Sequence, residues 1–314
     1  MSDPRSGLFK FDDSSGKSED EKSTDSDDEC GVSDQLLQYD LKEVRVLYSG
    51  RYSIIELVEN IKLNELQVIK WIPQDETYRQ YRIPEERSNG SILAKSSTLE
   101  HMKHPNVKKL SRECRIIQQL KHSNVVTFIR TITDDKRMKI GIVTEYLEKG
   151  SLGDVPESEC FSDGQIWKYF VTCLEGLDYL HRVQVVHRDI NPNNLLRTTE
   201  EQIKITDFGL SEEYAEDRPL RGTIGTPQYL APECVKEPGE PYDGKPVDVW
   251  ALGMTLYWMI QREVSDPNMV YTELRQNYYD GENKYDIFEK IQREPAVVER
   301  QDEYVIIRIT YAAR

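Results

Sequence analysis

Two carboxylate side chains and one carboxamide side chain in the middle of the chain are the kinds of group that phosphoryl transfer requires, and they occur in the required order. Asp189 can accept the proton of an attacking hydroxyl group, and Asn194 and Asp207 can hold Mg²⁺ against the phosphate oxygens of ATP. Between the last two residues, Leu195-Leu196 and Ile203-Lys204-Ile205 predict two short strands. The sequence therefore indicates a nucleotide-dependent phosphoryl-transfer site.

Further motifs around this site occur in the order typical of eukaryotic protein kinases. They are Val68-Ile69-Lys70, Glu113, His187-Arg188-Asp189, Asp207-Phe208-Gly209, Ala231-Pro232-Glu233 and Asp248. With these motifs the chain resembles that superfamily over residues 44–298. It is most similar to the calcium/calmodulin-dependent protein kinase kinases, and next to the liver tumour-suppressor kinase. The segments on which this similarity rests are Asp154–Pro156, Gly225–Glu233 and Gly244–Gly253. The resemblance implies a bilobal α+β fold, with a small β-rich N-lobe at 44–145 and a helical C-lobe at 146–298.

The resemblance also implies roles for single residues. Asp189 is the catalytic base, Lys70 orients the α- and β-phosphates, and Glu113 holds the ammonium of Lys70 by an ion pair. Asp248 braces the catalytic loop. The other positions assigned to the nucleotide site are Tyr48, Gly50, Ser53, Ile55, Val68, Thr144, Glu145, Leu147, Ser151 and Leu196. ATP and Mg²⁺ are the expected cofactors. Protein hydroxyl groups are the expected substrates, for an upstream kinase in a signalling cascade.

Two departures from the kinase pattern concern groups near the phosphates. Tyr48 and Ser53 replace two of the three glycines in the loop that covers the phosphates, whereas Gly50 remains, and their Cβ atoms should stiffen the loop. Asn191 stands where serine/threonine kinases have a lysine. By analogy with removed oxyanion donors, roughly 2–4 kcal/mol of transition-state stabilisation is expected to be lost. These departures leave a second hypothesis open, a pseudokinase that binds nucleotide and acts as a scaffold with little transferase activity.

The sequence also leaves open how the activation segment is controlled. Arg188 can bind a phosphate group on this segment, for which Thr223 is the best candidate. The same segment already carries Glu212 and Glu213, and the related kinase kinases resemble enzymes that do not depend on such a phosphate. By resemblance, Thr226 favours serine and threonine over tyrosine as substrates.

The charge distribution divides the 314 residues into a tail and a catalytic unit. The net charge of −15 is concentrated at the N-terminal end, so residues 1–43 predict an acidic disordered tail. Polar residues with turn signals predict an insertion at about 74–97. No segment after the helix predicted at 285–291 resembles the last kinase helices. We therefore expect a truncated C-lobe, a divergent tail at 299–314 and an exposed apolar patch at Trp258–Ile260.

Composition argues against several other classes of protein. The five cysteines form no C-x-x-C pair, which opposes a zinc ribbon or a disulfide scaffold and favours a reducing compartment. Because the net charge is negative, the composition gives no sign of a basic surface that would bind nucleic acid. No basic leader precedes an apolar segment, and no apolar run reaches about 18 residues. A protein of the cytoplasm, or also of the nucleus, without a membrane span is expected, and no calmodulin-binding helix is visible in the sequence.

Overall fold

The computed structural model describes most of the two lobes. The described residues are 36–50, 53–73, 105–134, 139–156, 158–215, 219–235, 239–261, 283–293, 297–298 and 307–308. The insertion expected at 74–97, and most of the tails expected at 1–43 and 299–314, lie outside these ranges.

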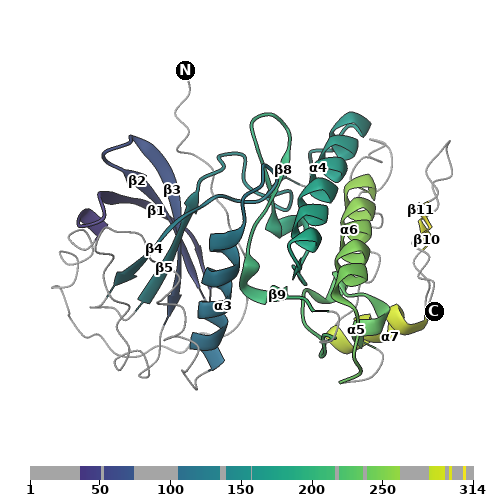
Figure 1. Ribbon diagram of the computed structural model, residues 1–314. Helices are drawn as coiled ribbons and strands as arrows, with labels where there is room; N and C mark the ends of the chain where they lie inside the picture. The colour runs from purple at the N-terminus through teal and green to yellow at the C-terminus, as the bar shows by residue number, and fades with distance from the viewer. Residues whose placement is uncertain are drawn as a thin grey trace, which may run out of the picture.

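The N-terminal lobe contains a five-stranded antiparallel sheet and one long helix (Figure 1). The strands are β1 (Leu41–Ser49), β2 (Ile54–Asn60), β3 (Glu65–Pro73), β4 (Phe128–Asp134) and β5 (Lys139–Glu145). Their order in the sheet is β1-β2-β3-β5-β4, so β3 is the central strand and Lys70 lies within it. Helix α3 (Pro105–Gln119) lies between this sheet and the C-terminal lobe (Figure 1).

One face of the sheet carries an apolar core of its own. Because successive strand residues point to opposite faces, alternate positions on several strands meet in one buried cluster. Its buried members are Leu36, Leu41, Val58, Ile69, Trp71, Ile132 and Val143. Since Leu36 and Leu41 belong to this core, the folded lobe begins before residue 44, the boundary predicted from the sequence.

The C-terminal lobe is built on two long helices, α4 (Asp163–Arg182) and α6 (Gly244–Gln261), which lie side by side (Figure 1). A reciprocal pair of hydrogen bonds between Ser162 and Gln165 caps the start of α4. The other elements of this lobe are β6 (Val185–Val186), β7 (Leu195–Arg197), β8 (Ile203–Ile205), β9 (Glu212–Glu213), α5 (Pro232–Val235) and α7 (Lys284–Arg293). Two further strands, β10 (Val297–Val298) and β11 (Ile307–Arg308), pair with each other. No helix in the described part of the chain has the length and apolar character needed to cross a membrane.

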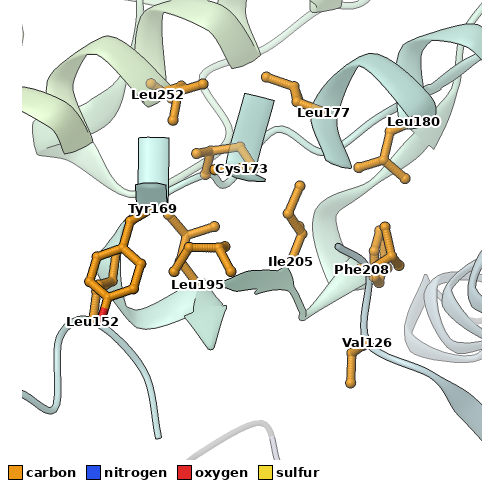
Figure 2. Close-up of a cluster of buried hydrophobic side chains, with 14 of the residues drawn as sticks. Val126, Leu152, Tyr169, Cys173, Leu177, Leu180, Leu195, Ile205, Phe208 and Leu252 are labelled. Atoms are coloured by element: carbon orange, nitrogen blue, oxygen red, sulfur yellow. The ribbon is translucent and has the colours of Figure 1, made fainter. Parts of the chain in front are cut away.

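Two short antiparallel strand pairs rest on the core of this lobe. The two short strands that the sequence predicts, β7 and β8, pair with each other, and β6 pairs with β9. Figure 2 shows Cys173 and Leu177 of α4 near Ile205 of β8, with Phe208 farther along the same chain segment. Because the strand pairs pack on α4, the loops that leave them have a fixed position relative to both long helices.

The end of α6 is buried, contrary to the expectation of an exposed patch. Met259 and Ile260 are only 1% and 6% exposed. Trp258 packs against the same core, and its ring centroid lies 6.2 Å from that of Phe161. The physical reason is that α6 is apolar on nearly all sides, so that its last turn is covered by neighbouring elements. The predicted exposure is therefore wrong for Met259 and Ile260, whereas Trp258 is partly buried.

Candidate active site

A buried carboxylate holds the backbone of the loop that carries the candidate base. Asp248 is fully buried near the start of α6. Its Oδ1 accepts a hydrogen bond from the backbone N of Arg188 at 2.7 Å. Its Oδ2 accepts one from the backbone N of His187 at 2.8 Å and one from Nε2 of His181 at 2.9 Å. Arg188 needs this support because its φ of 68° is unfavourable for a residue other than glycine.

Replacing Asp248 by alanine should lower the stability of the protein strongly. Two buried N–H groups would lose their acceptor, at about 1–3 kcal/mol each, so the free energy of unfolding should fall by on the order of 2–6 kcal/mol. Urea denaturation measures this change. Asp178→Ala is the control, because Asp178 is an exposed ion-pair partner of Arg182 on α4; it should cost less than about 0.5 kcal/mol. If the free energy of unfolding fell equally in the two variants, the proposed role of Asp248 in bracing the loop would be contradicted.

The candidate base Asp189 is oriented by groups from two other segments. Its Oδ1 accepts hydrogen bonds from the backbone N and from Oγ1 of Thr226, at 2.9 and 2.7 Å. Its Oδ2 accepts one from Nδ2 of Asn194 at 2.9 Å, and the same Nδ2 donates to the backbone O of Asp189 at 2.9 Å. The structure thus brings Asp189, Asn194 and Thr226 together, and the carboxylate is oriented before any substrate binds.

Asn191, the residue in place of the expected lysine, has a local role in this loop. It is only 3% exposed. Its Nδ2 donates to the backbone O of Asp189 at 3.0 Å and to Oγ1 of Thr226 at 3.3 Å, whereas its Oδ1 accepts from the backbone N of Asn193 at 3.0 Å. The amide therefore caps the following turn and links the loop to Thr226. The expected loss of transition-state stabilisation stays a prediction.

Lys70 lies between two carboxylates, of which the sequence predicts one. Its Nζ is 2.8 Å from Oε1 of Glu113 on α3 and 2.7 Å from Oδ1 of Asp207. Burial alone would lower the pKa of Lys70, but the two carboxylates outweigh burial and raise this pKa above its ordinary value. Burial alone would raise the pKa of Asp207, but the ammonium of Lys70 outweighs it and the pKa is lowered. Lys70 and Asp207 are therefore both charged at neutral pH.

Two side-chain oxygens beside this cluster suit a metal ion. Asp207 has a left-handed backbone conformation, and its Oδ1 also accepts a hydrogen bond from the backbone N of Gly209 at 3.1 Å. Asn194 is held close by, since its backbone O accepts from the backbone N of Thr206 at 3.0 Å. Within the described residues, no hydrogen bond reaches Oδ2 of Asp207 or Oδ1 of Asn194. Carboxylate and amide oxygens are ligands that Mg²⁺ prefers, so the pair fits the expected ion.

Strand register brings several predicted nucleotide-site positions together. Val68 on β3 is paired with Thr144 on β5, and Ile55 on β2 lies opposite the lysine of the charged cluster. Leu196 forms a bridge with Ser151 from the connector between the lobes. These contacts place the predicted positions in two groups, one on the sheet and one at the start of the C-terminal lobe.

The connector after β5 turns on its own hydrogen bonds. The backbone O of Leu147 accepts from the backbone N of Gly150 at 3.0 Å. Ser151 is buried, and its hydroxyl accepts from the backbone N of Asp154 at 3.1 Å. The Ser151 hydroxyl is therefore engaged within its own turn, and its contact with ribose stays a prediction.

The kinase motifs do not include Lys204, but in the structure it forms an ion pair with the last residue of β5. Nζ of Lys204 lies 2.6 Å from Oε1 of Glu145, which also accepts from the backbone N of Thr127 at 2.7 Å. Burial alone would raise the pKa of Glu145, but the hydrogen bonds from Lys204 and Thr127 outweigh it and lower this pKa. The alternation of Ile203, Lys204 and Ile205 is the signal in the sequence, because it turns the lysine away from the buried face of β8.

The loop between β1 and β2 has a tyrosine folded against its remaining glycine. A Cβ atom added at Gly50 would meet the hydroxyl end of the Tyr48 ring, although more than half of Tyr48 is exposed. The backbone N of Gly50 donates to the backbone O of Ser53 at 3.0 Å and closes the turn. A larger residue at position 50 would have to displace the exposed ring of Tyr48. The loop residues 51–52 lie outside the described ranges.

Arg188 and Thr223, for which the sequence leaves contact through a phosphate group open, have other partners in the structure. Oγ1 of Thr223 donates to the backbone O of Cys234 at 2.8 Å. Nη1 of Arg188 donates to Oε2 of Glu212 at 2.7 Å, and its Nη2 donates to Oη of Tyr242 at 3.0 Å. The structure therefore brings a carboxylate, and not Thr223, to the guanidinium of Arg188.

Known proteins with similar sequences are protein kinases. The model of the family described as protein kinase domain matches residues 77–306. The chain is 36% identical over 228 residues to a calcium/calmodulin-dependent protein kinase kinase of Caenorhabditis elegans, covering 71% of this chain and 41% of the relative. It is 36% identical over 204 residues to the serine/threonine-protein kinase STE20 of Candida glabrata, covering 65% and 21%. It is 30% identical over 256 residues to the serine/threonine-protein kinase GRIK1 of Arabidopsis thaliana, covering 81% and 56%.

These relatives are longer proteins, because the chain spans between 21% and 56% of their lengths. The family match starts after β3 and so does not include Lys70. The place of this lysine in the site rests on its two ion pairs.

Proposed function

Since the chain belongs to the protein kinase domain family, we propose that it transfers the γ-phosphate of Mg-ATP to serine and threonine hydroxyls of proteins. The observation that carries this proposal is the ion-paired cluster of Lys70, Glu113 and Asp207. Together with Asp189 and Asn194, which are hydrogen-bonded to each other, this cluster contains the polar groups that phosphoryl transfer uses. Each group also has a partner that orients it.

Each residue of the site has a separate role in phosphate transfer. ATP with its magnesium ion supplies the phosphoryl group and neutralises part of its charge. Lys70, held by its ion pairs, would donate hydrogen bonds to phosphate oxygens, and Asp207 and Asn194 would hold the ion through their side-chain oxygens. Asp189 accepts the proton of the attacking hydroxyl as its oxygen bonds to the γ-phosphorus. The bond from that phosphorus to the bridging oxygen breaks, and ADP is the leaving group. The hydrogen bonds from Thr226 keep the carboxylate of Asp189 in one orientation.

The position of Thr226 and the names of the relatives support serine and threonine as acceptors. The hydroxyl of Thr226 lies between Asp189 and Asn191, at 2.7 and 3.3 Å. The test uses four peptides that are identical except for serine, threonine, tyrosine or alanine at one position. The serine and threonine peptides should accept phosphate from Mg-ATP, and the tyrosine and alanine peptides should not. Transfer to the tyrosine peptide alone would refute this acceptor class.

The second candidate function, a nucleotide-binding scaffold, is favoured by the absence of a lysine at position 191. If the protein is a slowed enzyme, Asn191→Lys should place a positive charge beside the γ-phosphate and raise kcat with little change in ATP affinity. The gain should be at most about 10²–10³-fold. It should fall short of this limit because the buried amide of Asn191 also caps the turn through Asn193.

Single-turnover rates at saturating Mg-ATP measure this effect, with Asn191→Ala as the matched control. Asn191→Ala removes the amide without adding a charge and should slow transfer. Equal nonzero rates for wild type and Asn191→Lys would show that the asparagine already fulfils the role of the lysine. No transfer from either protein, with ATP bound to both, would favour the scaffold.

We further propose Mg²⁺ as the metal, proteins and not nucleic acids as the partners, and the cytoplasm or nucleus as the location. The oxygen ligands of Asn194 and Asp207 support Mg²⁺. The net charge of −15 opposes binding to a phosphate backbone. The four cysteines within the described residues are free, which supports a reducing compartment. Removing Mg²⁺ with a chelator should stop transfer, and adding it back should restore the rate.

A further inference from the structure

The guanidinium of Arg188 is enclosed by protein groups. Its side chain is only 4% exposed. Nη1 donates to Oε2 of Glu212 at 2.7 Å, and Nη2 donates to Oη of Tyr242 at 3.0 Å and to the backbone O of Arg221 at 3.2 Å. Among the described residues, Glu212 supplies the one carboxylate that forms an ion pair with Arg188. This carboxylate therefore neutralises a charge that would be costly to bury alone.

The second oxygen of Glu212 extends the contact to the helix that carries Glu113. Oε1 of Glu212 lies 3.5 Å from Nη1 of Arg112, the residue before Glu113 on α3. The neighbouring Glu213 makes a similar contact, since its Oε2 lies 3.0 Å from Nη2 of Arg115. Figure 1 shows β9 running close to α3. Two ion pairs therefore tie β9 to the helix that positions the partner of the catalytic-site lysine.

Strand pairing holds Glu212 at the junction of these elements. β6 and β9 are antiparallel, with Val186 opposite Glu212, and Arg188 follows two residues after Val186. The preceding residue, Ser211, is buried, and its hydroxyl donates to the backbone O of His187 at 3.3 Å. The backbone on both sides of the carboxylate is thus fixed to the catalytic loop, and Glu212 meets Arg188 as a consequence of the fold.

We propose that Glu212 is a positioning residue that does the work of a phosphate group on the activation segment, so that the unphosphorylated protein is competent for transfer. This inference rests on the proposed kinase function. A phosphate group can bridge two arginines through separate oxygens. The two oxygens of Glu212 bridge Arg188 and Arg112 in the same manner. Thr223, the candidate acceptor of such a phosphate, donates its hydroxyl to Cys234.

The test compares wild type with Glu212→Gln after both are treated with a phosphatase and shown by intact mass to carry no phosphate. The amide keeps the shape of the side chain but removes its charge, so kcat should fall by about tenfold or more, with a smaller change in the KM for ATP. Glu212→Asp keeps the charge and should recover part of the loss. Asp178→Asn is the control, because it removes an exposed carboxylate from a surface ion pair on α4 and should leave the rate unchanged.

Hydrogen exchange adds a readout that needs no turnover. Backbone amides of α3 should exchange faster in Glu212→Gln than in wild type or Asp178→Asn, because β9 holds the helix less firmly. The inference is overturned if wild type transfers phosphate only after it is phosphorylated, or if Glu212→Gln changes neither kcat nor exchange. If no form of the protein transfers phosphate, the proposed function fails, and the exchange comparison alone decides the role of Glu212.

Discussion

Replacing Asp189 by asparagine should slow phosphate transfer by about 10²–10⁴-fold, the usual contribution of a general base. The amide cannot take the proton of the attacking hydroxyl. It has nearly the same shape, and its oxygen can still accept the two hydrogen bonds from Thr226. The hydrogen bond from Asn194 is lost, which should cost only about 1 kcal/mol of stability. Single-turnover rates, with the Kd for ATP measured on the same samples, should show slow transfer and nearly unchanged nucleotide binding.

The control for this variant is Asp178→Asn, which makes the same chemical change at an exposed position of α4. It should keep the wild-type rate and nearly the wild-type Tm. An Asp189→Asn protein that transfers phosphate as fast as wild type would refute the assignment of the base. A variant that loses activity together with its cooperative thermal transition would show that Asp189 is needed for folding.

Replacing Lys70 by methionine should abolish measurable transfer, with a loss of at least about 10²–10³-fold. Methionine fills a similar volume but has no charge for the phosphate oxygens, and it leaves Glu113 and Asp207 without their shared cation. Both the rate and the affinity for ATP should fall. Lys62→Met is the control, because Lys62 is a highly exposed lysine paired with Asp40. If both variants retain wild-type transfer, Lys70 is not part of the site.

The same variant should also change how stability depends on pH. A carboxylate whose pKa is lowered in the folded state stabilises the fold above its unfolded pKa, near 3.8 for Asp207, and loses this contribution as the pH falls through the folded pKa. Lys70→Met removes the cation that lowers this pKa. The difference in Tm between wild type and Lys70→Met should therefore be largest near neutral pH and shrink below about pH 4. A difference that grows on acidification would contradict the ion pair between Lys70 and Asp207.

The motif residues could be predicted because their types and order resemble those of protein kinases, whose chemistry of phosphoryl transfer requires these groups. Lys70 and Glu113 meet as the sequence predicts, since the lysine lies on a strand and the glutamate lies on a helix that packs beside the sheet. Strands β7 and β8 are predicted from two short apolar segments joined by a polar turn, and the structure shows that they pair. In these cases the local pattern and the chemistry point to the same arrangement.

Other features could not be predicted because they depend on tertiary contacts with no periodic signal. Strands β6 and β9 have two residues each, too few for an alternation to show, yet their pairing brings Glu212 to Arg188. The local role of Asn191 depends on the approach of Thr226 from a distant segment. Family resemblance describes Asn191 only as a missing charge, whereas the geometry shows an amide with three hydrogen bonds.

The most direct test of the central claim measures phosphate transfer and ATP binding on the same phosphatase-treated wild-type protein. At saturating Mg-ATP with a serine peptide, we expect transfer that exceeds the rate of Asp189→Asn, because the proposed base, the proposed lysine clamp and the proposed metal ligands are held by hydrogen bonds and ion pairs. Tight ATP binding without any transfer above the Asp189→Asn rate would contradict this account and identify the protein as a nucleotide-binding scaffold.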